Sequence, residues 1–258
     1  MKKTALITGA SNGIGLELAK VHAAQGGDLI LAARSIQKLN ELKLDLEKKH
    51  NINVMCVEID LSKPNASIML YDEIKKQNVK VDYLINNAGF GDFGLFHEAD
   101  QDKMMQMIQL NISALTQLTR LYLPEMVKDG KGKIMNVASA AAFQPGPTMA
   151  VYYATKAYVL HLTEAISNEI ENTGVSITAL CPGATISGFK DAADLQESKL
   201  FKNKSLPTSK EVAEYGYEQM LKGKVVAIHG MMNFLMANSV RFAPRSLVLK
   251  IVRMIQDK

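Results

Sequence analysis

Residues 4–15 read TALITGASNGIG, so a short apolar and β-branched run, Thr4–Thr8, leads directly into a turn with three glycines. The run predicts a buried strand, and the turn opens straight into a helical pattern. Glycines here let the backbone turn tightly and approach a pyrophosphate, whose charge a helix N-terminus favours. The spacing is Gly-x-x-x-Gly-x-Gly instead of the commoner Gly-x-Gly-x-x-Gly. Because the turn follows the first strand, it predicts a nucleotide-binding site.

The rest of the chain repeats this alternation of strand and helix. The runs that predict strands are nearly continuous and apolar, as in parallel strands buried on both faces. We therefore expect an α/β fold, a Rossmann-type doubly wound parallel sheet of seven strands with helices on both faces. The expected strands are 4–8, 28–33, 53–59, 83–86, 133–138, 176–181 and 224–228, and the expected helices are 13–25, 36–49, 64–77, 101–128, 150–173 and 209–221.

Composition indicates an ordinary globular protein. The chain has 258 residues, of which 47% are hydrophobic and 22% charged, and a net charge of +4. No linker divides it, so we expect one catalytic domain, residues 1–230, and a C-terminal amphipathic extension, residues 231–258. The extension holds five basic residues and one acid, which accounts for the whole net charge. The charge elsewhere is balanced, and no nucleic-acid partner is expected.

Cysteine and histidine usage points to the cytoplasm and to no metal. Cys56 and Cys181 each lie in an apolar run without Cys-x-x-Cys spacing, which predicts buried free thiols and a reducing compartment. The five histidines show no spacing typical of metal ligands. The N-terminal apolar run is broken by Gly9 and Ser11, so we expect neither a signal peptide nor a membrane span there.

The end of the second predicted strand indicates which nicotinamide cofactor is used. In dinucleotide-binding folds an acid at this place binds the ribose hydroxyls, and a nearby basic residue accommodates a 2′-phosphate. Ala33 stands where the acid would be, and Arg34 follows it. A guanidinium is well shaped for phosphate, so we expect NADP(H), with Ser11 as a second phosphate contact. The alternative is that Arg34 is a solvated surface residue.

Candidate acid/base residues lie on the fifth predicted helix. Tyr152 and Lys156 are four apart in sequence, so they share one helix face. Tyrosine has an ordinary pKa of about 10, and an ammonium nearby favours the phenolate. We therefore expect Lys156 to bring the pKa of Tyr152 toward the working range. Ser139, at the end of the fifth strand, lies at the sheet edge where ligands bind.

With further motifs, the chain resembles the short-chain dehydrogenase/reductase family from residue 4 to about 190. The motifs are TGASNGIG at 8–15, Asp60-Leu61, NNAG at 86–89, Asn111, Ser139, YYATK at 152–156 and PG at 182–183. The resemblance implies a catalytic set of Asn111, Ser139, Tyr152 and Lys156. The implied cofactor-binding residues are Gly9, Ser11, Asn12, Gly13, Ile14, Gly15, Arg34, Asp60, Leu61, Asn87, Ala88, Gly89, Tyr152, Lys156, Pro182, Gly183, Ile186 and Ser187.

The resemblance also implies individual roles. Tyr152 would exchange the proton, Ser139 would orient the substrate carbonyl, and Lys156 would also hold the nicotinamide ribose. Asn111 would hold a helix bulge and a water on the proton path. Asp60 would contact the adenine, Asn87 would support the sheet beside the cofactor, and Ile186 would lie by the carboxamide.

Two departures from the family pattern concern the cofactor. Many NADP-preferring members have a basic residue at the position of Asn12, and many members have Thr at the position of Ser187. Because of the first departure, only one of the two basic residues that usually indicate NADP(H) is present. The second departure leaves the expected phosphate contact in place, because a serine hydroxyl also binds phosphate.

The resemblance also implies that the substrate pocket is formed by the loops after strands four, five and six, at 90–97, 140–149 and 184–206. Phe93, Phe143 and Met149 suggest an apolar ketone or the matching alcohol, although such loops are also apolar simply to cover nicotinamide. Tyr153 is a weaker candidate than Tyr152 because it is three residues from Lys156. The alternatives are 3-oxoacyl-[acyl-carrier-protein] reductase, hydroxysteroid dehydrogenase, and a non-catalytic NADP-binding regulatory protein.

The basic amphipathic tail has two candidate roles. It can pack on the domain or on a second subunit, or it can make a peripheral membrane contact. We favour packing, and we expect a homo-oligomer (dimer or tetramer).

The catalytic set bears on the regulatory alternative. A damaged Ser/Tyr/Lys/Asn set would mark a regulatory protein, and here all four residues are present.

Overall fold

The computed structural model describes residues 2–187 and 206–256, and it confirms the predicted sheet. Seven parallel strands form one sheet in the order β3-β2-β1-β4-β5-β6-β7, so the strand order reverses between β1 and β4. The strands are β1 (Thr4–Thr8), β2 (Asp28–Ala33), β3 (Val54–Glu58), β4 (Tyr83–Asn86), β5 (Gly132–Val137), β6 (Val175–Cys181) and β7 (Val226–Ile228). The carboxyl ends on either side of this reversal are where α/β folds bind ligands.

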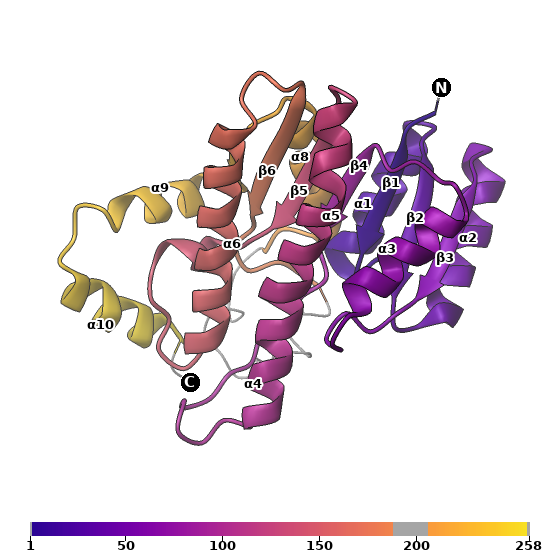
Figure 1. Cartoon of the computed structure of the whole chain (residues 1–258). Helices are drawn as coiled ribbons and strands as arrows, with labels where there is room; N and C mark the ends of the chain where they lie inside the picture. Colours follow the sequence, from indigo (N-terminus) through magenta and orange to yellow (C-terminus); the bar gives the residue numbers. More distant parts are fainter. Residues whose placement is uncertain (1, 188–205, 257–258) are drawn as a thin grey trace.

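Helices cover both faces because successive strand residues point to opposite sides. On one face Ile7 and Leu31 pack in a cluster with residues of α1 (Gly13–Ala24), α2 (Ile36–His50) and α8 (Ser209–Leu221). On the other face Leu6 and Ile30 pack with residues of α3 (Ala66–Lys76) and α5 (Leu115–Lys128). α6 (Ala150–Glu169) lies on this second side near β5 and β6 (Figure 1). The doubly wound architecture is therefore confirmed.

The long helix predicted over 101–128 is interrupted. α4 (Gln101–Ile108) continues into a π-helical segment, η1 (Gln109–Ala114), and then into α5. In a π-helical segment the hydrogen bonds join residues five apart instead of four, so the helix bulges locally. Such segments often occur at functional sites. The periodicity of the sequence does not show it, because the apolar pattern continues on both sides. Asn111 lies inside this segment.

Three further elements were not expected as separate helices. A four-residue 3₁₀ turn, η2 (Ala140–Phe143), follows β5 directly. After β7 the chain forms α9 (Met231–Ser239) and α10 (Arg245–Gln256), beyond α6 and at the opposite end of the molecule from α2 (Figure 1). Val248 and Val252 of α10 are buried in one cluster with Met149 and Tyr153. The C-terminal helices thus lie next to the loops at the carboxyl edge of the sheet.

Candidate active site

The glycine turn and the chain after β4 are in direct contact. The Asn87 side-chain amide donates to the carbonyl oxygens of Thr8, at 2.9 Å, and Gly9, at 3.2 Å. The Thr8 hydroxyl in turn accepts from the backbone N–H groups of Asn87 and Ala88, both at 3.0 Å. A Cβ on Gly15 would lie 2.4 Å from the Asn87 amide nitrogen. These contacts therefore require glycine at position 15.

The turn presents the N-terminus of α1. Gly9 and Gly13 have φ of +67° and +55°, which favours glycine. The Asn12 side chain makes no cap hydrogen bond, and the first turn of α1 holds no acid. An α-helix leaves its first N–H groups unpaired, and its dipole attracts anions there. Ser187 lies beside this turn, since a Cβ on Gly13 would be 3.5 Å from the Ser187 Cβ.

Arg34 and Asp60 lie at the ends of neighbouring strands. Arg34 follows β2, is exposed, and forms no ion pair within the parts of the chain that the structure describes. Burial alone would raise the pKa of Asp60, but hydrogen bonds from Ser62 and the charge of Arg34 bring it below its ordinary value. The Asp60 carboxylate accepts from the Ser62 hydroxyl at 2.7 Å and from its N–H at 3.0 Å. Leu61 is part of the core under α3.

Tyr152, Lys156 and Ser139 meet at the carboxyl end of β5. The Tyr152 side chain is hydrogen-bonded to Ser139. Ser139 is held in place in turn, because its hydroxyl oxygen accepts from the Ala141 N–H at 3.1 Å and caps η2. Lys156 Nζ donates to the Val137 carbonyl at 2.7 Å and lies 5.8 Å from the centre of the Tyr152 ring. The pair predicted from helix spacing therefore lies together in the structure.

The electrostatics differ from the expectation that Lys156 lowers the pKa of Tyr152. Burial raises the pKa of Tyr152, and the Ser139 hydrogen bond only opposes this shift. Burial also lowers the pKa of Lys156, from an ordinary 10.5 to about 8. The expectation is wrong for the protein's own groups, because burial dominates the shift in the pKa of Tyr152 and the interaction that opposes it comes from Ser139. Lys156 Nζ lies over the tyrosine ring. At neutral pH, Tyr152 is therefore a neutral phenol beside a charged lysine.

Asn111 connects the π-helical segment to the loop after β4. Its side-chain amide donates to the Phe90 carbonyl at 2.9 Å and to the Thr155 hydroxyl at 3.1 Å, and its oxygen accepts from the Phe90 N–H at 3.2 Å. A Cβ on Gly89 would lie 3.0 Å from the Asn111 oxygen and 3.5 Å from Lys156 Nζ. Asn111, Gly89 and Lys156 are therefore neighbours.

The Pro182-Gly183 motif after β6 lies at the same carboxyl end of the sheet as Ser139. The Pro182 carbonyl accepts from the Ala140 N–H at 2.8 Å, which joins this loop to η2. A Cβ on Gly183 would lie 2.4 Å from the side-chain nitrogen of Asn233 in α9. Ile186 is 60% exposed, and its carbonyl accepts from the Ser209 hydroxyl at 2.9 Å. The predicted pocket loop 184–206 continues into residues 188–205, which lie outside the described residues.

The predicted substrate residues fall into two clusters. Phe93 and Met149 belong to a cluster that contains Tyr152 and two α10 residues, Val248 and Val252. Phe143, the last residue of η2, packs instead against a cluster that contains Cys181 and Leu160. The sequence analysis did not assign the α10 residues to this cluster, although their spacing of four positions in a strongly amphipathic helix marks one buried face.

Tyr153 is held by the C-terminal helix. The buried Gln256 side chain donates a hydrogen bond to the Tyr153 hydroxyl and accepts one from Thr148 at 3.4 Å. The Thr148 carbonyl also accepts from the Gly94 N–H at 2.8 Å, and Thr148 has a φ of +68°. One set of contacts thus joins α10 to two loops of the site. It also gives Tyr153 a partner other than Ser139.

Replacing Gln256 tests this connection. Gln256→Leu leaves the buried Tyr153 hydroxyl without its partner, so we expect the free energy of unfolding to fall by about 1–3 kcal/mol. Adding Tyr153→Phe removes the unpaired hydroxyl, so the double variant should be more stable than Gln256→Leu alone. Urea unfolding measures both, with Gln106→Leu as an exposed control on α4. A double variant that is less stable than Gln256→Leu would contradict the assigned contact.

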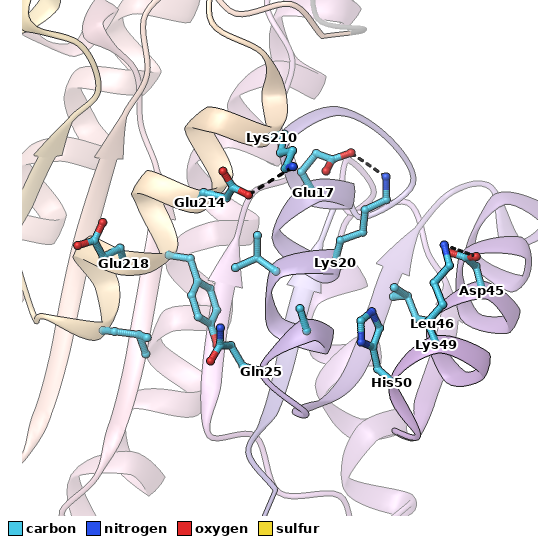
Figure 2. A pocket seen from close by; sticks show the side chains of 14 residues that line it. Glu17, Lys20, Gln25, Asp45, Leu46, Lys49, His50, Lys210, Glu214 and Glu218 are labelled. Atoms are coloured by element: carbon cyan, nitrogen blue, oxygen red, sulfur yellow. Dashed lines mark hydrogen bonds and ion pairs between the residues drawn. The ribbon is translucent and has the colours of Figure 1, made fainter.

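A groove lies away from this site, between α1, α2 and α8 (Figure 2). None of the predicted site residues lines it. Its charges pair along their own helices: Lys20 with Glu17 and Lys49 with Asp45, both at 2.8 Å, and Lys210 with Glu214 at 3.8 Å (Figure 2). Such pairs are typical of a solvated helix surface.

Over residues 2–187 and 206–256, no three His, Cys, Asp or Glu side chains gather to hold a metal ion. In the same ranges no helix is long and apolar enough to cross a membrane.

Comparison with known proteins identifies the family. The model of the short chain dehydrogenase family matches residues 3–198, so the chain belongs to this family of oxidoreductases. The NADP-dependent 3-hydroxy acid dehydrogenase of Schizosaccharomyces pombe is 32% identical over 222 residues, which cover 82% of this chain and 84% of the relative.

Two solved structures show the same similarity. A short-chain dehydrogenase from Sphingobium yanoikuyae in complex with NADPH is 29% identical with a TM-score of 0.83, over 93% of this chain and 94% of that one. A Burkholderia phymatum family member in complex with NAD is 25% identical with a TM-score of 0.80, over 92% of both chains. The resemblance seen in the motifs is therefore confirmed at the level of the family.

Proposed function

We propose that this protein reduces an apolar ketone with NADPH, or oxidises the matching secondary alcohol with NADP⁺, by hydride transfer. The observation that carries the proposal is the group formed by buried Tyr152 and Lys156 and half-buried Ser139, with Asn111 close by. In it the Tyr152 phenol is hydrogen-bonded to Ser139 and lies beside a lysine whose pKa burial lowers to about 8. A non-catalytic nucleotide-binding protein would not need this arrangement.

The residues present fit a dinucleotide. The open N-terminus of α1, with its unused Asn12 side chain and no acid in the first turn, suits a pyrophosphate. We propose that the turn residues and the chain around Asn87 hold the phosphates and adjacent groups. Arg34 would bind the 2′-phosphate, Asp60 the adenine, and Lys156 the nicotinamide ribose. The cofactor would supply or accept the hydride.

The chain's own residues would manage the proton. Tyr152, neutral at working pH, would donate its proton to the carbonyl oxygen during reduction, and Ser139 would hold that oxygen by a hydrogen bond. The charged Lys156 would stabilise the phenolate that forms. Asn111, fixed by Phe90 and Thr155, would hold the bulge that brings the proton path to Lys156. Positioned acid groups of this kind contribute about 10²–10⁴-fold in rate.

Arg34 gives a test of the cofactor assignment. If it binds the 2′-phosphate, Arg34→Ala should raise the KM for NADPH about 10- to 100-fold, the effect of losing a hydrogen bond to a charged group. The KM for NADH should change little, because NADH lacks this phosphate. Lys38→Ala, at an exposed cation in the first turn of α2, is the matched control. A wild-type preference for NADH by a wide margin would defeat the NADP(H) assignment.

An apolar substrate is supported by the cluster of Phe93, Met149, Val248 and Val252 beside Tyr152. A screen of ketones and secondary alcohols, followed by the nicotinamide absorbance with NADPH and NADH, tests it. Turnover of 3-oxoacyl thioesters or hydroxysteroids alone would identify one of the alternative activities. The absence of any turnover with bound NADPH would favour a regulatory protein.

A further inference from the structure

The C-terminal helices expose a large apolar surface. Four of its side chains are 64–89% exposed: Phe242 in the link between the helices, Met231 and Met232 at the start of α9, and Met254 in α10. Phe234, Leu235, Met236, Leu247 and Ile251 are 41–55% exposed. We call these residues of α9, the link and α10 the tail surface. So many exposed large apolar side chains within one short segment are unusual, because exposed apolar residues of monomeric proteins are normally scattered singly.

α10 carries two stripes of mainly apolar side chains, and one of them is buried against the domain. Val248, Val252 and Gln256, spaced by four positions, are buried against the domain. Leu247, Ile251 and Met254 follow helical spacing on an adjacent stripe, and they are 47%, 41% and 64% exposed. Packing on the domain therefore accounts for the first stripe and leaves the second facing solvent.

The charges on the tail surface indicate what covers it. Arg241, Arg245 and Lys250 are exposed, and residues 231–256 contain no Asp or Glu. A second copy of the same surface would place cations against cations, which disfavours self-association. An anionic lipid surface matches both features of the tail surface. Its headgroups attract the cations, and its acyl boundary accepts the apolar side chains.

We propose that the tail surface binds the surface of an anionic lipid bilayer, with α9 and α10 lying along it. This contact goes beyond the proposed reaction and does not depend on it. The inner stripe of α10 packs with Met149 and Tyr153, which adjoin Tyr152. The bilayer therefore lies on the substrate side of the candidate site.

Vesicle flotation of the full-length protein tests the proposal. We expect the protein to float with phosphatidylcholine vesicles that contain phosphatidylglycerol and to stay behind with phosphatidylcholine alone. Binding should weaken as salt is raised, because the Debye length falls from about 10 Å at 0.1 M to about 3 Å at 1 M. No flotation with the anionic vesicles at low salt overturns the proposal.

Charge reversals on the tail surface identify the binding residues. Each basic residue near an anionic surface contributes about fivefold to the partition coefficient, equivalent to about 1 kcal/mol. Lys250→Glu removes a cation and adds an anion, so it should weaken binding about 25-fold. Met254→Glu, which places a charge in the exposed stripe, should also abolish most binding. Arg241→Glu, in the link outside both helices, gives a further variant that is independent of helix packing.

Controls separate lipid binding from self-association and unfolding. Leu44→Glu and Lys48→Glu, at exposed positions on α2, match the test variants in chemistry and should leave flotation unchanged. Thermal unfolding shows whether each variant is folded. A folded Met254→Glu that dissociates an oligomer in light scattering while floating like the wild type would assign the surface to a second copy and overturn the proposal.

Discussion

Tyr152→Phe should lose about 10²–10⁴-fold in turnover of the best ketone substrate while still binding NADPH. The substitution removes only the hydroxyl that would donate the proton. Its ring remains in the cluster with Met149 and Val248, so the packing of the site is retained. Initial rates, nicotinamide fluorescence on binding and thermal unfolding distinguish lost chemistry from lost cofactor binding or lost folding.

Tyr153→Phe is the matched control for this prediction. The two tyrosines are adjacent and similarly buried, at 9% and 8% exposed, and their rings are 6.1 Å apart. They differ in their partners, because Tyr152 is bonded to Ser139 and Tyr153 to Gln256. Tyr153→Phe should therefore keep most of the turnover. An equal loss in both variants, or full turnover in Tyr152→Phe, would contradict the assignment of the proton donor.

The sequence predicts the sheet well because the local signals agree with each other. Runs such as Leu29–Ala33 are apolar at every position, and glycines such as Gly26 and Gly130 adopt the positive φ that ends a helix. The observed strand ends differ from the expected ones by a residue or two, as at β7. Ends of this kind depend on hydrogen bonds to a neighbouring strand, which the local sequence does not specify.

Other features of the site depend on contacts between distant residues. The π-helical segment around Asn111 has no signal in the apolar periodicity. Gln256 and Tyr153 meet across 103 positions, and nothing local to either residue indicates the contact. The pKa of Tyr152 was mispredicted because helix spacing places Lys156 nearby but does not reveal how deeply both are buried. Sequence patterns therefore identify candidate residues better than they predict the environment around them.

Lys156 should set the alkaline limit of ketone reduction. Its pKa is lowered by burial to about 8, so it is protonated below that pH and neutral above it. Burial raises the pKa of Tyr152, which therefore keeps its proton through the same range. The rate of reduction should be level below about pH 8. It should fall above that pH, as the charge that stabilises the developing phenolate is lost.

Lysine variants test which group causes the fall in rate above pH 8, the alkaline limb of the pH profile. Lys156→Met should lose about 10²–10⁴-fold in turnover, and its residual rate should show no limb near pH 8. Lys156→Arg stays protonated because the ordinary pKa of arginine is above about 12, so whatever activity it keeps should extend to higher pH. Lys133→Met is the control, because burial also lowers the pKa of Lys133, at the opposite end of β5. A limb near pH 8 that persists in Lys156→Met, or disappears in Lys133→Met, would assign the ionisation to another group.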